Sequence, residues 1–409
     1  MPMTRLDHRK ASCSITVKDA QGRPMPGQTV TAELVRHEFL FGCGVFFLID
    51  LLDPATPPAK KEYLQKLYDA WLGLFNYGTL PFYQGRYEPR EGQTRQEATL
   101  RAARRLRDDG AAVKGHPLCW HTVSAKWLLG RSNDEVLRNQ LARIRREIGA
   151  FKDVIILWDV INEVVIMPVF DKEDNAITRL CSEIGRVELV RRVFEEARAC
   201  DPNATLLLND FNTSDQYRQL IRCCLDAGVP IDVIGIQSHQ YQGFWGMDKL
   251  HEVLDRFSSF GMPIHFTENT FVSGHLMPPD IVDLNDYRIR EWPTTPEGED
   301  RQARDLLAMV DTLFAHPLVT AFTNWDFCDG AWLGAPAGLV RLDGSKKPAY
   351  DALWQRIHKD WHTRVTLMTD EQGCCTIDGF AGQYTLECLG KKADFTLSRN
   401  AAQQTIVMG

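Results

Sequence analysis

The chain of 409 residues lacks the features that mark membrane proteins and nucleic-acid-binding proteins. No apolar stretch approaches the roughly 20 residues that a membrane-spanning helix needs. The formal net charge is −7, and no basic stripe is present that would attract a phosphate backbone. We therefore expect a globular protein with neither a membrane nor a nucleic acid as its partner.

Leader-like and metal-binding patterns are also missing. The N-terminal segment Met-Pro-Met-Thr-Arg-Leu-Asp-His-Arg-Lys has no apolar region of the kind found in a secretory signal. The 11 cysteines are an odd number without metal-ligand spacing, and the adjacent pairs Cys223-Cys224 and Cys374-Cys375 are poorly suited to disulfides within each pair. These features favour a reducing compartment, so we expect a cytoplasmic protein, or a secreted one if a leader was trimmed. No cofactor or metal is expected.

Short apolar runs alternate with amphipathic segments through most of the chain. Eight such runs lie at residues 39–46, 74–82, 111–120, 154–163, 205–212, 233–239, 264–270 and 319–327. Residues 134–150, 186–200 and 301–314 have apolar side chains at helical spacing. This alternation predicts a (β/α)₈ TIM barrel, whose active site forms at the C-terminal ends of the strands. An open doubly wound sheet is the alternative, but no Gly-x-Gly-x-x-Gly follows the first run.

The two ends of the chain have a different pattern. Residues 12–36 and 363–409 alternate polar and apolar side chains around glycine-containing turns, with candidate strands at 365–367, 384–387 and 395–397. Because the N-terminal strands alone would be marginally stable, we expect one discontinuous β-sandwich built from residues 1–38 and 362–409. The catalytic barrel then occupies residues 39–361. Tyr384 and Phe380 are too few for a convincing sugar-stacking face, which favours a structural role for the sandwich.

Two glutamates follow apolar runs in the same setting. Glu163 ends the run Val-Ile-Ile-Leu-Trp-Asp-Val-Ile-Asn-Glu, and Glu268 ends Ile-His-Phe-Thr-Glu. Carboxyl groups at the C-terminal ends of two separate buried strands are what a double-displacement glycosidase requires. The fourth and seventh strands of a barrel lie across its mouth from each other, so the two side chains can converge. We interpret Glu163 as the acid/base and Glu268 as the nucleophile.

Other polar side chains fit the same site. His239, at the end of the sixth run, is expected beside Glu268, where an imidazole N–H could orient the carboxylate. Asn162 directly precedes the acid and is placed to bind the sugar 2-hydroxyl. His116 and His121 fall on opposite faces of an extended segment, which excludes a zinc site formed by this pair.

Several segments, taken in order, resemble one glycosidase family. They are Gly-His-Pro-Leu-Cys-Trp-His at 115–121, Trp-Asp-Val-Ile-Asn-Glu at 158–163, Leu-Asn-Asp-Phe-Asn at 208–212, Gly-Ile-Gln-Ser-His-Gln at 235–240, Phe-Thr-Glu at 266–268, a tryptophan block at 325–332 and Lys-Pro-Ala-Tyr at 347–350. The set resembles family 10 glycoside hydrolases, the endo-β-1,4-xylanases. The resemblance implies catalytic support from Asn162, His239 and Gln237. It also implies a −1 sugar region lined by His116, Trp120, Asn209, Trp325 and Trp332.

The block after the second run departs from the family pattern. Family members carry Thr-x-Glu-Asn and Lys-Trp there, which grip xylose in the glycone subsites. In this chain Thr79 is followed by Leu-Pro-Phe-Tyr-Gln-Gly-Arg-Tyr. Tyr83 and Arg86 are therefore candidate substrate-binding residues that form a replacement platform, or they only cover the barrel rim. The family's Thr-Glu-x-Asp also loses its Asp, since Thr270 stands at that position.

The residues and the resemblance together predict a retaining glycoside hydrolase of the endo-β-1,4-xylanase type, acting on xylan or xylo-oligosaccharides. The alternative is a related enzyme of the same clan that acts on another β-glycan, or on short oligosaccharides from their ends. The altered second block favours that alternative. A carbohydrate-binding barrel without catalysis is a further alternative, against which the retention of both glutamates argues. The oligomeric state and the choice between endo and exo action stay open at this point.

Overall fold

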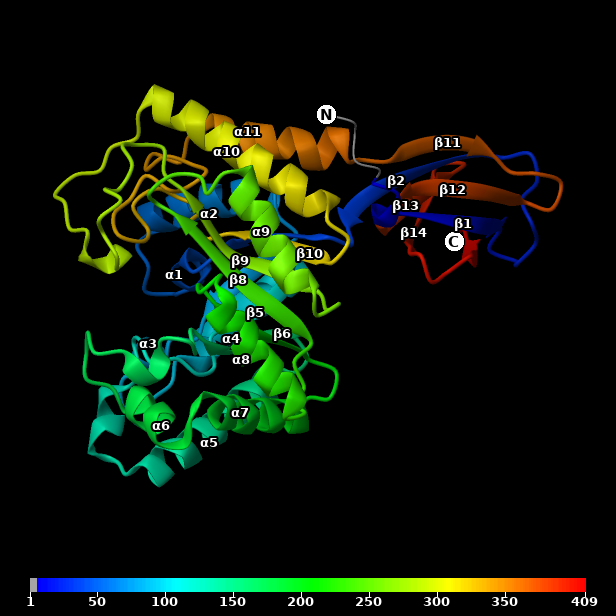
Figure 1. The fold of residues 1–409 in the computed structure, drawn as a ribbon. Coiled ribbons are helices and arrows are strands. Elements are labelled where there is room, and N and C mark those ends of the chain that lie inside the picture. The colour runs from blue at the N-terminus through cyan, green and yellow to red at the C-terminus, as the bar shows by residue number, and fades with distance from the viewer. Residues whose placement is uncertain (1–5) are drawn as a thin grey trace. The chain divides into compact units, whose positions relative to one another are not determined.

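The computed structural model describes residues 6–409, which divide into two compact units (Figure 1). The larger unit consists of Phe41–Val310 and Leu318–Tyr350. The smaller unit contains the N-terminal segment up to Leu40, then Asp311–Pro317, and the chain from Asp351 onward.

Eight strands close into a parallel barrel. They are β3 (Leu40–Gly44), β4 (Tyr77–Pro81), β5 (Ala112–His116), β6 (Leu157–Asn162), β7 (Thr205–Asp210), β8 (Val233–Gln240), β9 (Ile264–Phe271) and β10 (Val319–Asn324). Each strand neighbours the next one along the chain, and β10 neighbours β3 to close the ring. The predicted (β/α)₈ fold is confirmed.

The barrel strands are buried because helices cover the outer surface and side chains fill the interior. Every residue of β6 and of β9 is buried. Two predicted strand positions were inexact. β6 begins at Leu157 because the amides of Val154 and Ile155 still donate to the Phe151 carbonyl at the end of a helix. Glu268 does not end its strand, since β9 continues to Phe271 in register with β8.

Helices connect the strands, and the three predicted amphipathic segments are all helical. The longer ones are α2 (Pro58–Leu72), α4 (Gln96–Asp108), α5 (Asn133–Phe151), α7 (Arg186–Cys200), α8 (Asp215–Asp226), α9 (Met247–Ser258), α10 (Pro296–Ala315) and α11 (Pro348–Gln355). α6 (Ala176–Ile184) is similar in length to α11, whereas α1 (Phe47–Leu51) and α3 (Gln84–Tyr87) are shorter. A capping box starts α5, in which Ser132 and Glu135 satisfy each other's backbone amides. Within residues 6–409, no helix has the length and apolar character needed to cross a bilayer.

The smaller unit is built from both chain ends, as predicted. One sheet has the order β12-β1-β15 and the other has the order β11-β2-β13-β14. The strands are β1 (Lys10–Lys18), β2 (Thr29–His37), β11 (Arg364–Met368), β12 (Cys374–Phe380), β13 (Gly382–Cys388), β14 (Lys391–Leu397) and β15 (Gln403–Val407). Tyr384 and Phe380 are 1% and 6% exposed, so both belong to the core and neither can serve as a stacking surface.

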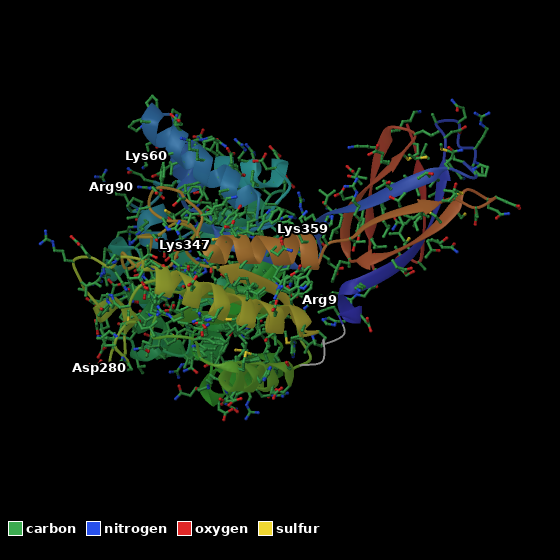
Figure 2. All side chains as sticks on the ribbon, turned by 90° about the horizontal axis from the view of Figure 1, so that it is seen from above. Arg9, Lys60, Arg90, Asp280, Lys347 and Lys359 are labelled. Carbon is green, nitrogen blue, oxygen red and sulfur yellow. The ribbon has the colours of Figure 1, made fainter. Side chains whose placement is uncertain are left out.

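The smaller unit also takes in segments that the sequence prediction assigned to the barrel domain. The guanidinium of Arg9, a residue labelled in Figure 2, donates to the carbonyls of Phe314 and His316 at 2.7 and 2.8 Å. The Phe314 ring stacks on Trp361 with centroids 4.0 Å apart. These contacts explain why Asp311–Pro317 and residues 351–361 cluster with the terminal strands, inside the predicted boundaries at 38 and 362.

Candidate active site

Glu163 directly follows β6 on a strained turn. Its φ of 58° lies in the left-handed region, which is uncommon for a residue other than glycine and is often found at functional sites. The neighbouring strand holds this turn, because the Glu163 amide donates to the Asn209 carbonyl at 2.9 Å. The Asp210 carboxylate accepts from the Val165 amide at 3.0 Å. The backbone that presents the predicted acid/base is therefore fixed by β7.

Neutral donors surround the Glu163 carboxyl group. Trp120 Nε1 donates at 2.8 Å, Gln237 Nε2 at 3.1 Å and Asn162 Nδ2 at 3.3 Å. Burial and the nearby charge of Glu268 raise the pKa of Glu163 to about 8, against the opposing effect of the bonds from Gln237 and Trp120. The group therefore keeps its proton near neutral pH, as a general acid must.

Glu268 lies inside β9 in surroundings that favour the opposite protonation state. Asn209 Nδ2 donates to its Oε1 at 2.8 Å, and His239 Nε2 lies 3.1 Å from its Oε2. His116 Nε2 lies 3.9 Å from Oε1. Burial disfavours the carboxylate, but the interactions with His116, His239 and Lys114 outweigh it and hold the pKa of Glu268 below its ordinary value. This carboxylate is ionised at neutral pH, as a nucleophile must be.

A buried ion-pair chain supports Glu268 from the barrel interior. Asp159 Oδ2 lies 2.8 Å from Lys114 Nζ and 2.6 Å from His116 Nδ1, and all three side chains are at most 1% exposed. Burial raises the pKa of Asp159, but Lys114 and His116 outweigh that effect and lower it. The ionised Asp159 fixes a proton on His116 Nδ1, which orients Nε2 toward Glu268.

Amide side chains connect the two glutamates. Asn162 Oδ1 accepts from Gln237 Nε2 at 3.0 Å and from Asn209 Nδ2 at 2.9 Å. The same Gln237 binds Glu163, and the same Asn209 binds Glu268. The structure thus brings the predicted residues Asn162, Asn209 and Gln237 into one network with both carboxyl groups.

Aromatic rings border this network. The Trp325 ring centroid lies 5.2 Å from that of His116 and 6.0 Å from that of His239. The Trp332 ring lies 4.6 Å from His239. On the other side, the Tyr83 ring is 5.5 Å from Trp120. Such faces suit the apolar C–H surface of a pyranose ring.

Arg86 is connected to the site only through Tyr83 in the contacts that the structure shows. Its guanidinium carbon lies 5.9 Å from the Tyr83 ring centroid, and its side chain is exposed. Among the contacts of residues 6–409, none joins Arg86 directly to Glu163 or Glu268.

Four residues at or near the site were not among the predicted site residues. Lys114 and Asp159 form the buried ion pair. His121 Nε2 lies 4.0 Å from Glu163 Oε2, and burial lowers the pKa of His121 to about 3, so this ring is neutral. Asp326 follows β10 next to Trp325, and burial raises its pKa to about 7. Their contacts are with other segments of the chain, which the sequence does not reveal. The one sequence signal that could have identified these four residues was their position inside or beside the family-like blocks.

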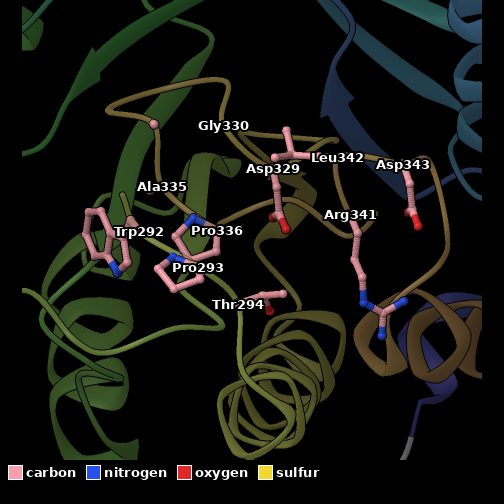
Figure 3. Close-up of a pocket in the computed structure, with 11 residues that line it drawn as sticks. Trp292, Pro293, Thr294, Asp329, Gly330, Ala335, Pro336, Arg341, Leu342 and Asp343 are labelled. Atoms are coloured by element: carbon pink, nitrogen blue, oxygen red, sulfur yellow. The ribbon is translucent and has the colours of Figure 1, made fainter. Parts of the chain in front are cut away.

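Asp329, within the tryptophan block at 325–332, lies in a different environment from the two glutamates. Its Oδ1 pairs with Lys347 Nζ at 2.5 Å and accepts from the Gly338 amide at 3.0 Å. It lines a surface depression of ≈ 380 Å³ bordered by Trp292, Pro293, Pro336 and Arg341 (Figure 3). None of the glutamate network lines this depression. Across residues 6–409, no group of His, Cys, Asp and Glu side chains is arranged to hold a metal ion.

The closed barrel is a (β/α)₈ fold that carries two carboxyl groups, Glu163 directly after β6 and Glu268 within β9. The sequence model of glycosyl hydrolase family 10 matches residues 84–356, and the chain belongs to this family. The predicted family resemblance is confirmed.

Several relatives with similar sequences carry xylanase names, and another carries a different name. Endo-1,4-beta-xylanase B of Paenibacillus barcinonensis is 32% identical over 60% of this chain and 74% of that protein. The endo-1,4-beta-xylanase/feruloyl esterase of Xylanibacter ruminicola is 29% identical, and the match spans 64% of this chain but 39% of that protein. Anti-sigma-I factor RsgI6 of Acetivibrio thermocellus is 25% identical over 97% of this chain and 48% of that protein.

Solved structures support the same fold. The family 10 structure from Paenibacillus barcinonensis aligns with a TM-score of 0.62 at 21% identity, over 78% of this chain and 95% of that chain. Native xylanase 10B of Thermotoga maritima aligns with a TM-score of 0.61 at 21% identity, over 79% of this chain and 96% of that chain. At these identities the likeness concerns the fold alone.

Proposed function

We propose that this chain is a retaining glycoside hydrolase that cleaves β-1,4-xylan or xylo-oligosaccharides by double displacement. Glu163 is the acid/base and Glu268 is the nucleophile. The observation that carries the proposal is the contrast between their partners. Glu163 is buried among neutral donors, whereas Glu268 faces two imidazoles. One protonated and one ionised carboxyl group are what the first chemical step requires.

In the first step, the Glu268 carboxylate attacks the anomeric carbon while Glu163 gives its proton to the leaving oxygen. The glycosidic C–O bond breaks, and an ester bond forms between the sugar and Glu268. Esterification removes the Glu268 charge, which is one cause of the raised pKa of Glu163. The pKa of Glu163 therefore falls in the intermediate, which suits its second role.

In the second step, the Glu163 carboxylate takes a proton from water while the water oxygen attacks the anomeric carbon. The ester bond breaks, Glu268 leaves as a carboxylate, and the sugar is released with its original configuration. Asn209 and His239 hold Glu268 through both steps, and Asn162 binds the 2-hydroxyl of the −1 sugar. His116, Trp120, Trp325 and Trp332 line that −1 region.

Xylan is the proposed substrate because the relatives of this chain carry xylanase names. A second candidate is another β-glycan, or short oligosaccharides cleaved from their ends. It is favoured by Tyr83 and Arg86, which occupy the place of the family's polar glycone block. A third candidate, a barrel that binds carbohydrate without cleaving it, predicts binding without turnover.

Hydrolysis of linear xylan, with products resolved by length and anomers followed by NMR, tests the proposal. We expect β-anomers first, and we expect Glu163→Ala and Glu268→Ala each to lose nearly all activity. On an aryl xylobioside, whose leaving group departs without protonation, azide should partly restore both variants, giving the β-azide with Glu163→Ala and the α-azide with Glu268→Ala. Initial α-anomers, or unchanged hydrolysis in either variant, would contradict the mechanism. Turnover of another β-glycan without any release from xylan would contradict the substrate assignment alone.

A further inference from the structure

Arg86 carries a positive charge at the rim of the site without an acidic partner. Within residues 6–409, no ion pair or side-chain hydrogen bond joins Arg86 to a carboxylate, and the contact that the structure shows is with the Tyr83 ring at 5.9 Å. Arg146, in contrast, is paired, since its Nη2 lies 2.6 Å from Glu88 Oε2. An unpaired guanidinium beside an aromatic ring can bind a carboxylate from outside the chain.

The turn that presents Arg86 is held from both sides. The Gly85 amide donates to the Val123 carbonyl at 2.7 Å, and a Cβ at Gly85 would lie 2.8 Å from the carbonyl oxygens of Val123 and Ser124. Below the turn, Tyr87 donates to Glu147 at 2.5 Å. Helix α3 therefore lies directly against the loop after β5, and its orientation is fixed.

Tyr83 links this turn to the catalytic network. Its ring lies 5.5 Å from Trp120, which donates to Glu163, and 5.6 Å from His116, which faces Glu268. Burial raises the pKa of the Tyr83 hydroxyl well above its ordinary value, and the charges of Glu268 and Glu163 add to the effect. A sugar chain bound across the two glutamates therefore passes close to Tyr83 and comes within reach of Arg86.

We propose that Arg86 binds a carboxylate on the substrate, so that the chain prefers xylan carrying uronic-acid side groups to the uncharged polymer. This inference rests on the proposed function. Sugar rings stack on Tyr83, and the uronate accepts hydrogen bonds from the planar guanidinium. Arg86 is a specificity residue here, because its contact is with the Tyr83 ring and not with either glutamate.

The test compares glucuronoxylan with the same polymer after reduction of its carboxyl groups to alcohols. We expect the unchanged protein to prefer the acidic polymer by roughly tenfold in kcat/KM, the scale of one charge-assisted interaction partly screened by water. Arg86→Gln should abolish the preference by raising KM on the acidic polymer alone, with kcat unchanged. Arg86→Lys keeps the charge without the planar fork and should retain part of the preference.

Arg90→Gln is the matched control, because this substitution removes the same charge. Arg90 is also exposed, but it lies outside α3 (Figure 2). It should keep the full preference. Equal cleavage of both polymers by the unchanged protein, or an unaltered preference in Arg86→Gln, would overturn the role of Arg86 and leave the double-displacement mechanism standing. Equal loss on both polymers in Arg86→Gln would also overturn it. Failure to cleave either polymer would overturn the proposed function itself, and this inference with it.

Discussion

Glu163 and Glu268 are chemically identical side chains in two different regions of one barrel. Glu163 accepts hydrogen bonds from an indole and two amides, none of which carries a charge. Glu268 faces His239 and His116, and His116 is itself held by a buried Lys114–Asp159 pair. Both carboxyl groups are buried, so burial alone would raise both pKa values. The difference lies in the charge of the partners, which reverses the effect of burial at Glu268 only.

The backbones of the two glutamates differ as well. Glu163 stands on a turn with a φ of 58° after β6, and its side chain is 14% exposed. Glu268 stands within β9, every residue of which is buried. A nucleophile gains from a fixed position, whereas an acid/base must also reach the water that enters in the second step. The strand and the turn fit these two requirements.

Loss of Glu268, the proposed nucleophile, is expected to have the largest effect. Glu268→Gln keeps the shape of the side chain but removes its charge, so kcat/KM on an aryl xylobioside should fall by roughly 10⁴-fold or more. Glu387→Gln makes the same change at an exposed position of β13 and should leave the rate unaltered. Retention of more than a tenth of the activity in Glu268→Gln would show that this carboxylate is not the nucleophile.

The effect of losing Glu163, the proposed acid/base, should depend on the leaving group of the substrate. Glu163→Gln should lower the rate on xylan by roughly 10²- to 10⁴-fold, with a smaller loss on aryl glycosides whose leaving group needs less protonation. Because the pKa of Glu163 is raised to about 8 by burial and by Glu268, activity of the unchanged protein should decline as the pH rises through that value. The alkaline decline should vanish in Glu163→Gln. Equal losses on both substrates, with the decline still present, would assign the proton to another group.

The raised pKa of Glu163 also affects stability. The folded state holds this proton more tightly than the unfolded chain. The contribution of the bound proton to the free energy of unfolding is therefore complete below the ordinary glutamate pKa, and it is lost as the pH rises to about 8. Because the group is nearly buried, the loss approaches about 1.4 kcal/mol per pH unit within that window, reduced by its partial exposure. Glu163→Gln should therefore raise the melting temperature more at pH 8 than at pH 5. An equal change at both pH values would contradict the assigned burial effect.

Replacing an imidazole partner of Glu268 should shift the acidic side of the pH profile. His239→Gln keeps a hydrogen-bond donor but cannot carry a positive charge. Because the interaction with His239 lowers the pKa of Glu268, this pKa should rise in the variant. The acidic limb of kcat/KM should move up by about one pH unit. His251→Gln, at an exposed position of α9, should leave the profile in place. An unmoved acidic limb in His239→Gln would refute the electrostatic role of this ring.

The smallest effect is expected from a neutral partner of Glu163. Trp120→Phe keeps an aromatic ring but removes the N–H that binds Glu163 at 2.8 Å. Because this bond lowers the pKa of Glu163, its loss should move the alkaline limb upward by a fraction of a pH unit. The rate at neutral pH should fall by less than about tenfold, the scale of one neutral hydrogen bond. A downward shift of the limb would contradict the hydrogen-bond assignment.

The sequence predicted the barrel well because its buried strands form unmistakable apolar runs. It predicted the sandwich less completely, since β12 and β15 were not among the candidate strands. β12 buries alternate residues, but one of them is Gly379, which weakens its apolar signal in the sequence. β15 buries only Ile406, so it gives no alternating apolar pattern. β15 also pairs in parallel with β1, a contact between distant parts of the chain that no local pattern reveals.

The candidate site was predictable where polarity changes at the end of a strand. Asn162 and Glu163 stand out because they follow an apolar run, and the family-like blocks added Gln237 and Asn209. Lys114 and Asp159 were missed because each lies within a buried strand, and their pairing joins β5 to β6 across 45 residues of chain. Which carboxyl group keeps its proton depends on these contacts between strands, so a linear sequence cannot show it.

The most direct test of the contrast between the two glutamates is a carbon-13 NMR titration of the side-chain carboxyl groups in protein labelled at glutamate. One carboxyl group should titrate at about 8 and disappear in Glu163→Gln, while the signal lost in Glu268→Gln should titrate below the ordinary glutamate range. If both carboxyl groups titrate within the ordinary range, or if the group near 8 persists in Glu163→Gln, the assignment of acid and nucleophile is wrong.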